Sequence, residues 1–215
     1  MLAAEGAKVM ASARREDRLR QLKDELAGHT VEICAADANR AADMERLAAE
    51  TKRLLGTVNI LVYATGTNTP DRAMKRLRPE IWDELVSTNL NGAYYITHAV
   101  LPAMREARDG HLIYISSISG HTPDVSGAAY QASKRGLIGL AHAIRVEEKE
   151  NSIRTTVINP GMVDTELIGK RPVKTPDEIV AQALKPEHVA EVVLACAKLP
   201  PRAVVTELSV VPTTL

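Results

Sequence analysis

Three side chains in this sequence could together move a proton. Tyr130 and Lys134 lie four residues apart in "YQASK", so a helix would place both on one face. Ser117 lies thirteen residues before Tyr130, near the end of the apolar run "HLIYISSISG". A buried strand ending in hydroxyl groups and followed by a Tyr–Lys pair suits proton transfer to or from a substrate oxygen.

A phenol with a pKa of about 10 needs roughly 4 kcal/mol of preference for its phenolate before it can exchange protons near neutral pH. A lysine ammonium about 5 Å away supplies on the order of 3 kcal/mol at an effective dielectric constant of about 20. We therefore predict that Lys134 lowers the pKa of Tyr130. The alternative is an unrelated surface pair, because the Tyr-x-x-x-Lys spacing also arises by chance.

Short apolar runs rich in β-branched residues alternate along the chain with longer segments of helical periodicity. This alternation predicts an α/β fold, a single domain over residues 1–215 with a doubly wound, mostly parallel, Rossmann-like sheet. Ligands of such sheets bind at the carboxyl ends of the strands. The predicted strands are 8–13, 31–36, 58–64, 111–116, 154–159 and 207–211, and the predicted helices include 19–26, 44–55, 81–107, 127–151 and 186–199. Residues 162–186 are read as an irregular segment, either a lid over a pocket or a surface connection.

Composition argues against several classes of function. The 27 basic and 27 acidic side chains cancel, so we expect no nucleic acid or anionic lipid as partner. The two cysteines, Cys34 and Cys196, lie in apolar stretches and indicate small buried side chains in a reducing, cytoplasmic compartment. The longest run without charged residues, 85–104, contains Pro102 and several polar residues, which excludes a membrane span. The six histidines show no metal-ligand spacing, so no metal is expected.

Four motifs in order resemble the short-chain dehydrogenase/reductase family over essentially the whole chain. They are "STNLNGAYYIT" with Asn89, "SSIS" with Ser117, "YQASK" and "NPGMVDTEL". The resemblance implies an oxidoreductase that interconverts an alcohol and a ketone or aldehyde by hydride transfer. It implies that Tyr130 is the general acid/base, that Ser117 orients the substrate oxygen, and that Lys134 also binds the nicotinamide ribose. Asn89 would bend its helix and help hold a water molecule that links Lys134 to solvent.

The resemblance also implies a dinucleotide site. The backbone of Pro160, Gly161 and Val163, with the Thr165 hydroxyl, would hold the nicotinamide end, Asp37 and Ala38 would face the adenine, and Ala64 and Gly66 would flank the adenosine ribose. Arg14 follows the tip of the second strand of the family's fold, where a carboxylate would bind a ribose 2′-hydroxyl. A guanidinium there favours a 2′-phosphate, so we predict NADP(H), with Ser12 and Arg15 assisting. Each of these assignments has an alternative. Pro160 and Gly161 could form an ordinary turn, Asp37 could cap a helix, and Arg14 and Arg15 could belong to the solvated helix start "RRED".

Two features depart from the family pattern. Tyr63 to Gly66, "YATG", stand where the family has Asn-Asn-Ala-Gly, so local support for the sheet must differ. The family's glycine-rich phosphate loop, which joins its first strand to its first helix, has no counterpart. We expect the absence of that strand to expose the edges of the strands around Val9 and Val62.

Two explanations for this departure stay open. The reading frame could begin upstream of Met1, which we favour because the catalytic positions are intact. Otherwise the chain is a truncated, non-catalytic relative that acts as an oligomerisation partner or regulator. In both cases we expect a homodimer or homotetramer built on the small-residue helix 127–143 and the helix 89–107. A third reading keeps the fold and cofactor but changes the reaction to epimerisation or dehydration; the short C-terminus argues against the larger sugar-modifying relatives.

Overall fold

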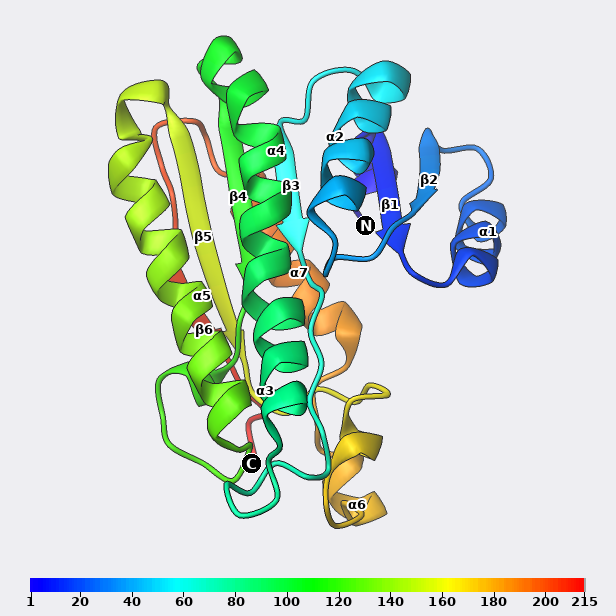
Figure 1. The fold of residues 1–215 in the computed structure, drawn as a ribbon. Helices are drawn as coiled ribbons and strands as arrows, with labels where there is room; N and C mark the ends of the chain where they lie inside the picture. Colours follow the sequence, from blue (N-terminus) through cyan, green and yellow to red (C-terminus); the bar gives the residue numbers. More distant parts are fainter. Residues whose placement is uncertain (215) are drawn as a thin grey trace.

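The computed structural model describes residues 1–214 and contains six strands, all paired in parallel (Figure 1). They are β1 Val9–Ala13, β2 Val31–Ala35, β3 Ile60–Tyr63, β4 Gly110–Ile115, β5 Ile153–Pro160 and β6 Glu207–Val210. Each begins and ends within two residues of a predicted strand. The predicted α/β class is confirmed, but the strands form two separate sheets, β1-β2 and β3-β4-β5-β6.

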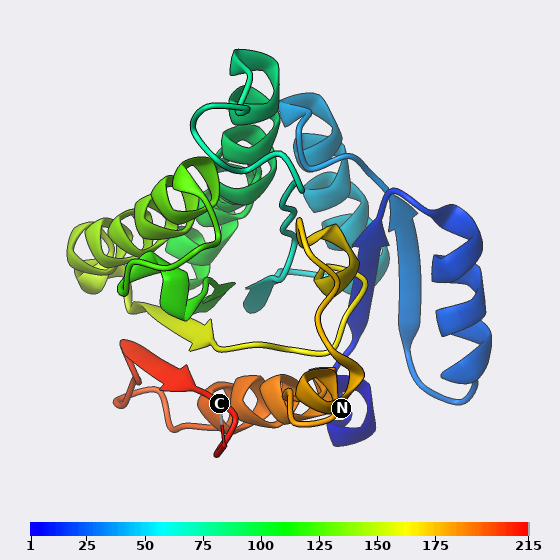
Figure 2. The ribbon, with the colours of Figure 1, turned by 90° about the horizontal axis from the view of Figure 1, so that it is seen from below.

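Helices cover both faces of the sheets (Figure 2). One face carries α2, α4 and α5 side by side, and the opposite face carries α7. The main core lies between the first of these layers and strands β4 and β5, where Met104, Leu112 and Val157 have no exposed surface. The helices are α1 Glu16–Glu25, α2 Ala41–Leu55, α3 Pro79–Val86, α4 Gly92–Ala107, α5 Ala128–Glu147, α6 Asp177–Val180 and α7 Pro186–Ala197, with short turns η1 Leu2–Glu5, η3 Ile118–Gly120, η4 Lys149–Asn151 and η5 Ile168–Lys170. No helix within residues 1–214 is long and apolar enough to cross a membrane.

The segment predicted as one helix over 81–107 is divided in the structure. A π-helical turn, η2 Ser87–Asn91, separates α3 from α4. Tyr63, at the end of β3, donates a hydrogen bond from its hydroxyl to the Thr88 carbonyl at 2.6 Å and so supports the widened turn. Gly92 follows directly, and a Cβ there would lie 2.8 Å from the Ala38 carbonyl oxygen. The different local support expected at "YATG" is therefore a tyrosine that links the sheet to η2.

The edges of β1 and β3 that face each other are unpaired within the described chain, as expected from the sequence. The N–H of Val9 donates to the Thr30 carbonyl and the Ala13 carbonyl accepts from the Ala36 N–H, both on the β2 side. Because successive peptide groups alternate along a strand, those of Met10 and Ser12 point away from β2. Asn59 accepts from His111 of β4, so the peptide groups of Ile60 and Val62 point toward β1. A cavity of about 1160 Å³ lies between the two strands.

Candidate active site

The structure brings Ser117, Tyr130 and Lys134 together at the carboxyl end of β4. Gly127, with φ of 92°, precedes α5 and sets the start of the helix that carries Tyr130 and Lys134 on one face. Ser117 follows β4, and its hydroxyl accepts a hydrogen bond from the Ser119 backbone N–H at 3.2 Å. All three side chains are buried, and the Lys134 ammonium lies 5.9 Å from the centre of the Tyr130 ring. The four-residue spacing of Tyr130 and Lys134 therefore corresponds to a buried cluster with Ser117 and not to an unrelated surface pair.

Lys134 is a buried cation with spare hydrogen-bonding capacity. Its Nζ donates to the Ile115 carbonyl at 2.9 Å, the one partner that the structure gives it among residues 1–214. An ammonium has three N–H donors, so two stay available. Burial lowers the pKa of Lys134 to about 8. A Cβ on Gly66 would lie 3.2 Å from Nζ, so the glycine leaves space beside the ammonium.

The pKa of Tyr130 differs from the expectation. We predicted that Lys134 lowers it, but burial of the phenol raises the pKa of Tyr130 above its usual value. Ser117 and Arg72 act in the opposite direction without overcoming the desolvation, and Lys134 does not contribute. The prediction was wrong because it weighed a charge at a distance and left out the cost of burying a phenolate.

Asn89 lies in η2 with no exposed surface. Its Oδ1 accepts from the Thr67 N–H at 2.7 Å, and its Nδ2 donates to the Thr67 carbonyl at 3.1 Å and to the Ser133 hydroxyl at 3.0 Å. Asn89 therefore holds the loop after Gly66 against α5. The expected bend of the helix at Asn89 is present as the π turn, whereas the water that Asn89 was expected to hold stays a prediction.

Residues predicted to bind the adenosine end of a dinucleotide line the cavity between β1 and β3. They are Ser12, Arg14, Arg15, Asp37, Ala38 and Gly66. Arg15 and the neighbouring Arg18 hold Glu166 at 3.1 and 2.6 Å, whereas Arg14 forms no ion pair with any residue of 1–214. Asp37 accepts from the Asn39 N–H at 3.0 Å, which closes a local turn, whereas the N-cap of α2 is Arg40, so Asp37 is not the helix cap considered above. Ala64 is exposed at the end of β3 and is not part of the cavity wall.

The predicted nicotinamide-end residues follow β5. Gly161 donates its N–H to the Val210 carbonyl at 2.8 Å, so this group is used by β6. Met162 and Asp164 pair with Leu184, which by alternation leaves the N–H and carbonyl of Val163 directed the other way. Pro160 is buried at the end of β5, and Thr165 is exposed with its hydroxyl accepting from the Leu167 N–H at 3.3 Å. The irregular segment that continues from here lines the cavity through Glu166, Leu167 and Lys170, which favours the lid over the surface connection.

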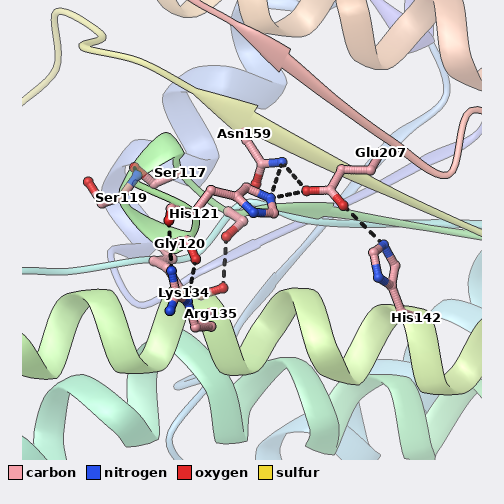
Figure 3. A network of polar contacts seen from close by, with 10 residues as sticks. Ser117, Ser119, Gly120, His121, Lys134, Arg135, His142, Asn159 and Glu207 are labelled. Carbon is pink, nitrogen blue, oxygen red and sulfur yellow. Dashed lines mark hydrogen bonds and ion pairs between the residues drawn. The ribbon is translucent and has the colours of Figure 1, made fainter. Parts of the chain in front are cut away.

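A polar network fixes the turn after Ser117 (Figure 3). Arg135 of α5 donates to the carbonyls of Gly120 and His121, both at 2.7 Å. His121 also contacts Glu207 of β6, which accepts a hydrogen bond from Asn159 at 2.7 Å. The network therefore positions the backbone that carries Ser117.

Within the described residues no group of His, Cys, Asp and Glu side chains is arranged to hold a metal ion.

Sequence reasoning missed Arg72, which lies in the loop between β3 and α3 and is only 8% exposed. The loop reads "TPDRAMKRLRPE", a polar run with prolines, and nothing in it distinguishes Arg72 from the exposed Arg76 and Arg78. Arg72 is buried because its side chain lies against Gly127 and its guanidinium reaches the Lys170 carbonyl. These contacts join segments far apart in the sequence, so no local pattern reveals them.

A parallel α/β fold with a buried Ser–Tyr–Lys cluster after β4, and a large cavity along β1 and β3 whose wall reaches the cluster at Gly66, defines a dinucleotide-type oxidoreductase site. The chain belongs to the short chain dehydrogenase family, whose model matches residues 1–175. An uncharacterized oxidoreductase of Staphylococcus aureus is 29% identical over 212 residues, which is 99% of this chain and 89% of the relative. The protein is therefore an oxidoreductase.

Solved structures agree with this assignment. A serine dehydrogenase from Escherichia coli is 30% identical with a TM-score of 0.86 and is matched by 100% of this chain over 90% of its own length. The closed form of serine dehydrogenase complexed with NADP+ is 32% identical with a TM-score of 0.90, over 100% of this chain and 88% of that one. An alcohol dehydrogenase from Thermococcus sibiricus, complexed with 5-hydroxy-NADP, is 25% identical with a TM-score of 0.89, over 100% and 89%.

Proposed function

We propose that the protein interconverts an alcohol and a ketone or aldehyde with NADP(H), using Tyr130 as the general acid/base. The observation that carries the proposal is the buried cluster of Ser117, Tyr130 and Lys134 beside Gly66 and the cavity. Solved neighbours in complex with NADP+ and with 5-hydroxy-NADP support the choice of cofactor. Arg14 supports it independently, because its guanidinium has no ion-pair partner in residues 1–214 and lines the cavity.

The residues present fit the nicotinamide end of such a cofactor. The spare donors of Lys134 suit a ribose hydroxyl, and the free backbone groups of Val163 suit an amide. NADP(H), when bound, accepts or donates a hydride at its nicotinamide ring. The remaining proposed contacts are Ser12, Arg14 and Arg15 for the 2′-phosphate, Asp37 and Ala38 for the adenine, Gly66 for the adenosine ribose, and Pro160, Gly161 and Thr165 near the nicotinamide.

In the proposed reaction Tyr130 exchanges one proton with the substrate oxygen. During oxidation the phenolate of Tyr130 takes the hydroxyl proton while a hydride leaves the carbon, and during reduction the phenol returns that proton. Ser117 hydrogen-bonds the same oxygen and fixes its position. Burial raises the pKa of Tyr130, so the phenol is the resting form and is ready to act as the acid in the reductive direction.

The test compares Tyr130→Phe with Tyr94→Phe, which removes a hydroxyl from a half-exposed tyrosine of α4. With NADPH and a panel of ketones and aldehydes, Tyr130→Phe should lower kcat by about 10² to 10⁴, while Tyr94→Phe stays within twofold of wild type. Comparable turnover in wild type and Tyr130→Phe would remove Tyr130 from the mechanism. No turnover by wild type of any member of the panel, in either direction, would count against the reaction.

The NADP(H) preference has its own test. Arg14→Ala should weaken binding of NADPH while leaving NADH binding unchanged, because only NADPH carries the 2′-phosphate. Arg20→Ala is the control, since Arg20 is an exposed residue of α1 that pairs with Glu16. Titration of each dinucleotide by fluorescence measures both affinities. Equal preference in wild type and Arg14→Ala would disprove the role of Arg14.

One observation favours a second candidate function, that of a non-catalytic subunit. The facing edges of β1 and β3 are unpaired within residues 1–214, and no glycine-rich turn lies between them to hold a pyrophosphate. Exposed Tyr94 of α4 and Val146 of α5 would suit contacts with another copy. A hundredfold excess of NADPH over its dissociation constant should stabilise an enzyme by about 2.7 kcal/mol, and no thermal shift together with a stable oligomer by light scattering would favour the subunit.

A further inference from the structure

Arg72 is a buried cation that forms no ion pair with a carboxylate of residues 1–214. Its Nε donates to the Thr69 carbonyl at 3.0 Å, and one Nη donates to the Lys170 carbonyl at 2.8 Å. Both acceptors are neutral, and a guanidinium offers five N–H donors, so three stay free. Arginine keeps its charge even when buried, which makes an unpaired one costly.

The charges around Arg72 leave the region positive. Within the described chain no aspartate or glutamate forms an ion pair with Arg72. Burial lowers the pKa of Arg72, and the nearby positive charge of Arg171 lowers it further. Asp124 is the acidic group that acts on Arg72, but its two oxygens already accept from Ser119 Oγ at 2.5 Å and the Ser126 N–H at 2.7 Å. An anion from outside the chain would complete the site.

Arg72 lies next to the proposed acid/base. Gly127 is the N-cap of α5 and lies three residues before Tyr130. A Cβ on Gly127 would lie 2.6 Å from the Cβ of Arg72, so the Arg72 side chain packs directly against this glycine. The charge of Arg72 lowers the pKa of Tyr130, and a Tyr130 phenolate raises that of Arg72, so the two groups act on each other electrostatically. Arg72 therefore lies against the turn that leads into the helix carrying Tyr130.

We propose that Arg72 binds a carboxylate of the substrate, so that the protein acts on a hydroxy acid and the corresponding oxo acid. The inference rests on the proposed function and names the substrate class of that same site. A single buried guanidinium matches a singly charged planar carboxylate, which it can hold through two parallel N–H bonds. The oxidised or reduced carbon then lies a few bonds from the carboxylate.

A purely structural role is the competing explanation, because Arg72 also joins its loop to the Lys170 segment. The two roles separate when each variant is tested on an acid and on its neutral ester. The probes are 2-hydroxybutanoate, 3-hydroxybutanoate and their methyl esters, and the variants are Arg72→Gln and Arg78→Gln, which makes the same charge change at an exposed arginine.

Wild type should prefer at least one acid over its ester in kcat/KM. Arg72→Gln should lower kcat/KM for that acid by about 30-fold or more, mainly through KM, and leave the ester within threefold; Arg78→Gln should change the acid by less than fivefold. Equal losses for acid and ester in Arg72→Gln, or a wild type that shows no preference for either acid, would overturn the inference while the proposed reaction stands.

Binding without turnover keeps the two proposals distinguishable. If no alcohol is oxidised, calorimetric titration of 3-hydroxybutanoate and 2-hydroxybutanoate still tests the site. Binding to wild type that is lost in Arg72→Gln and kept in Arg78→Gln supports the carboxylate site and contradicts only the reaction. Absence of binding of both acids to wild type contradicts the site. The ratio of kcat/KM for the acid to kcat/KM for its ester is measured on wild type alone. It therefore still tests the inference if Arg72→Gln misfolds.

Discussion

The Lys134 ammonium lies 5.9 Å from the centre of the Tyr130 ring, and burial shifts the pKa values of the two groups in opposite directions. Lysine loses its proton more easily than usual and tyrosine keeps its proton more firmly, so the protein environment favours the neutral form of both. A ligand that accepts a hydrogen bond from the ammonium would favour the charged form of Lys134, and a positive charge close to the phenol would favour the phenolate of Tyr130.

Lys134 makes a measurable contribution to stability at alkaline pH. Its pKa falls from 10.5 to about 8 on folding, so between pH 8 and pH 10 the unfolded chain holds more protons and stability rises with pH. Wild type should gain about 2 kcal/mol relative to Lys134→Met across this interval. Urea unfolding of both proteins at pH 8, 9 and 10 measures the difference. A constant difference would show that Lys134 is not buried as described.

Tyr63 and Gly92 should show coupled effects on stability. Gly92→Ala places a methyl group 2.8 Å from the Ala38 carbonyl and against the Tyr63 hydroxyl, and should cost about 1 to 3 kcal/mol. Tyr63→Phe loses the bond to Thr88 and should cost about 1 kcal/mol. The double variant should be more stable than the sum of the two losses, because removing the hydroxyl relieves part of the clash. Additive free energies of unfolding would argue against this contact.

The unpaired edges predict a pattern of amide exchange that alternates along β1 and β3. The N–H groups of Met10, Ser12, Ile60 and Val62 point into the cavity, so they should exchange faster than the N–H of Val9, which donates to the Thr30 carbonyl at 2.9 Å. Site-resolved hydrogen exchange by NMR measures each position. Equal protection of Val9 and Met10 would mean that another strand pairs with β1.

The ion pair of Arg105 with Glu148 should matter more than a surface pair. Glu148 is 3% exposed, and its bond to Arg105 holds the pKa of the carboxyl below its usual value. This stability is present above about pH 4.5 and is lost as the pH falls through the lowered value. Arg105→Met should cost about 1 to 2 kcal/mol at pH 7, because Glu148 stays buried. Arg53→Met, in the exposed pair with Glu50, should cost less than about 0.5 kcal/mol.

The sequence was a good guide to the strands and to the site residues that lie within one motif. Each strand is a short apolar run with clear ends, and Tyr130 and Lys134 share a face because helical geometry alone determines it. The division of 81–107 into α3, η2 and α4 was not predictable in the same way. The apolar periodicity passes through η2 unchanged, and the widened turn depends on Tyr63 from another element.

Two properties of the site could not be predicted from the sequence, because both depend on burial. The raised pKa of Tyr130 follows from the side chains that enclose it, which a distance estimate between two charges does not include. The isolation of Arg72 follows from Gly127 and Lys170, which are 55 and 98 residues away (127 − 72 and 170 − 72). Both become visible only when distant segments are placed together.

The division into two sheets also bears on how the molecule unfolds. No backbone hydrogen bond of a strand ladder crosses from β1-β2 to β3-β4-β5-β6, so within the described residues the two parts communicate through helix packing and the ion pairs of Glu166. Small domains usually unfold in one cooperative step because every part depends on a shared core. Here β1, α1 and β2 could melt as a separate unit at lower denaturant concentration than the rest, and a single midpoint would then misstate the stability of both.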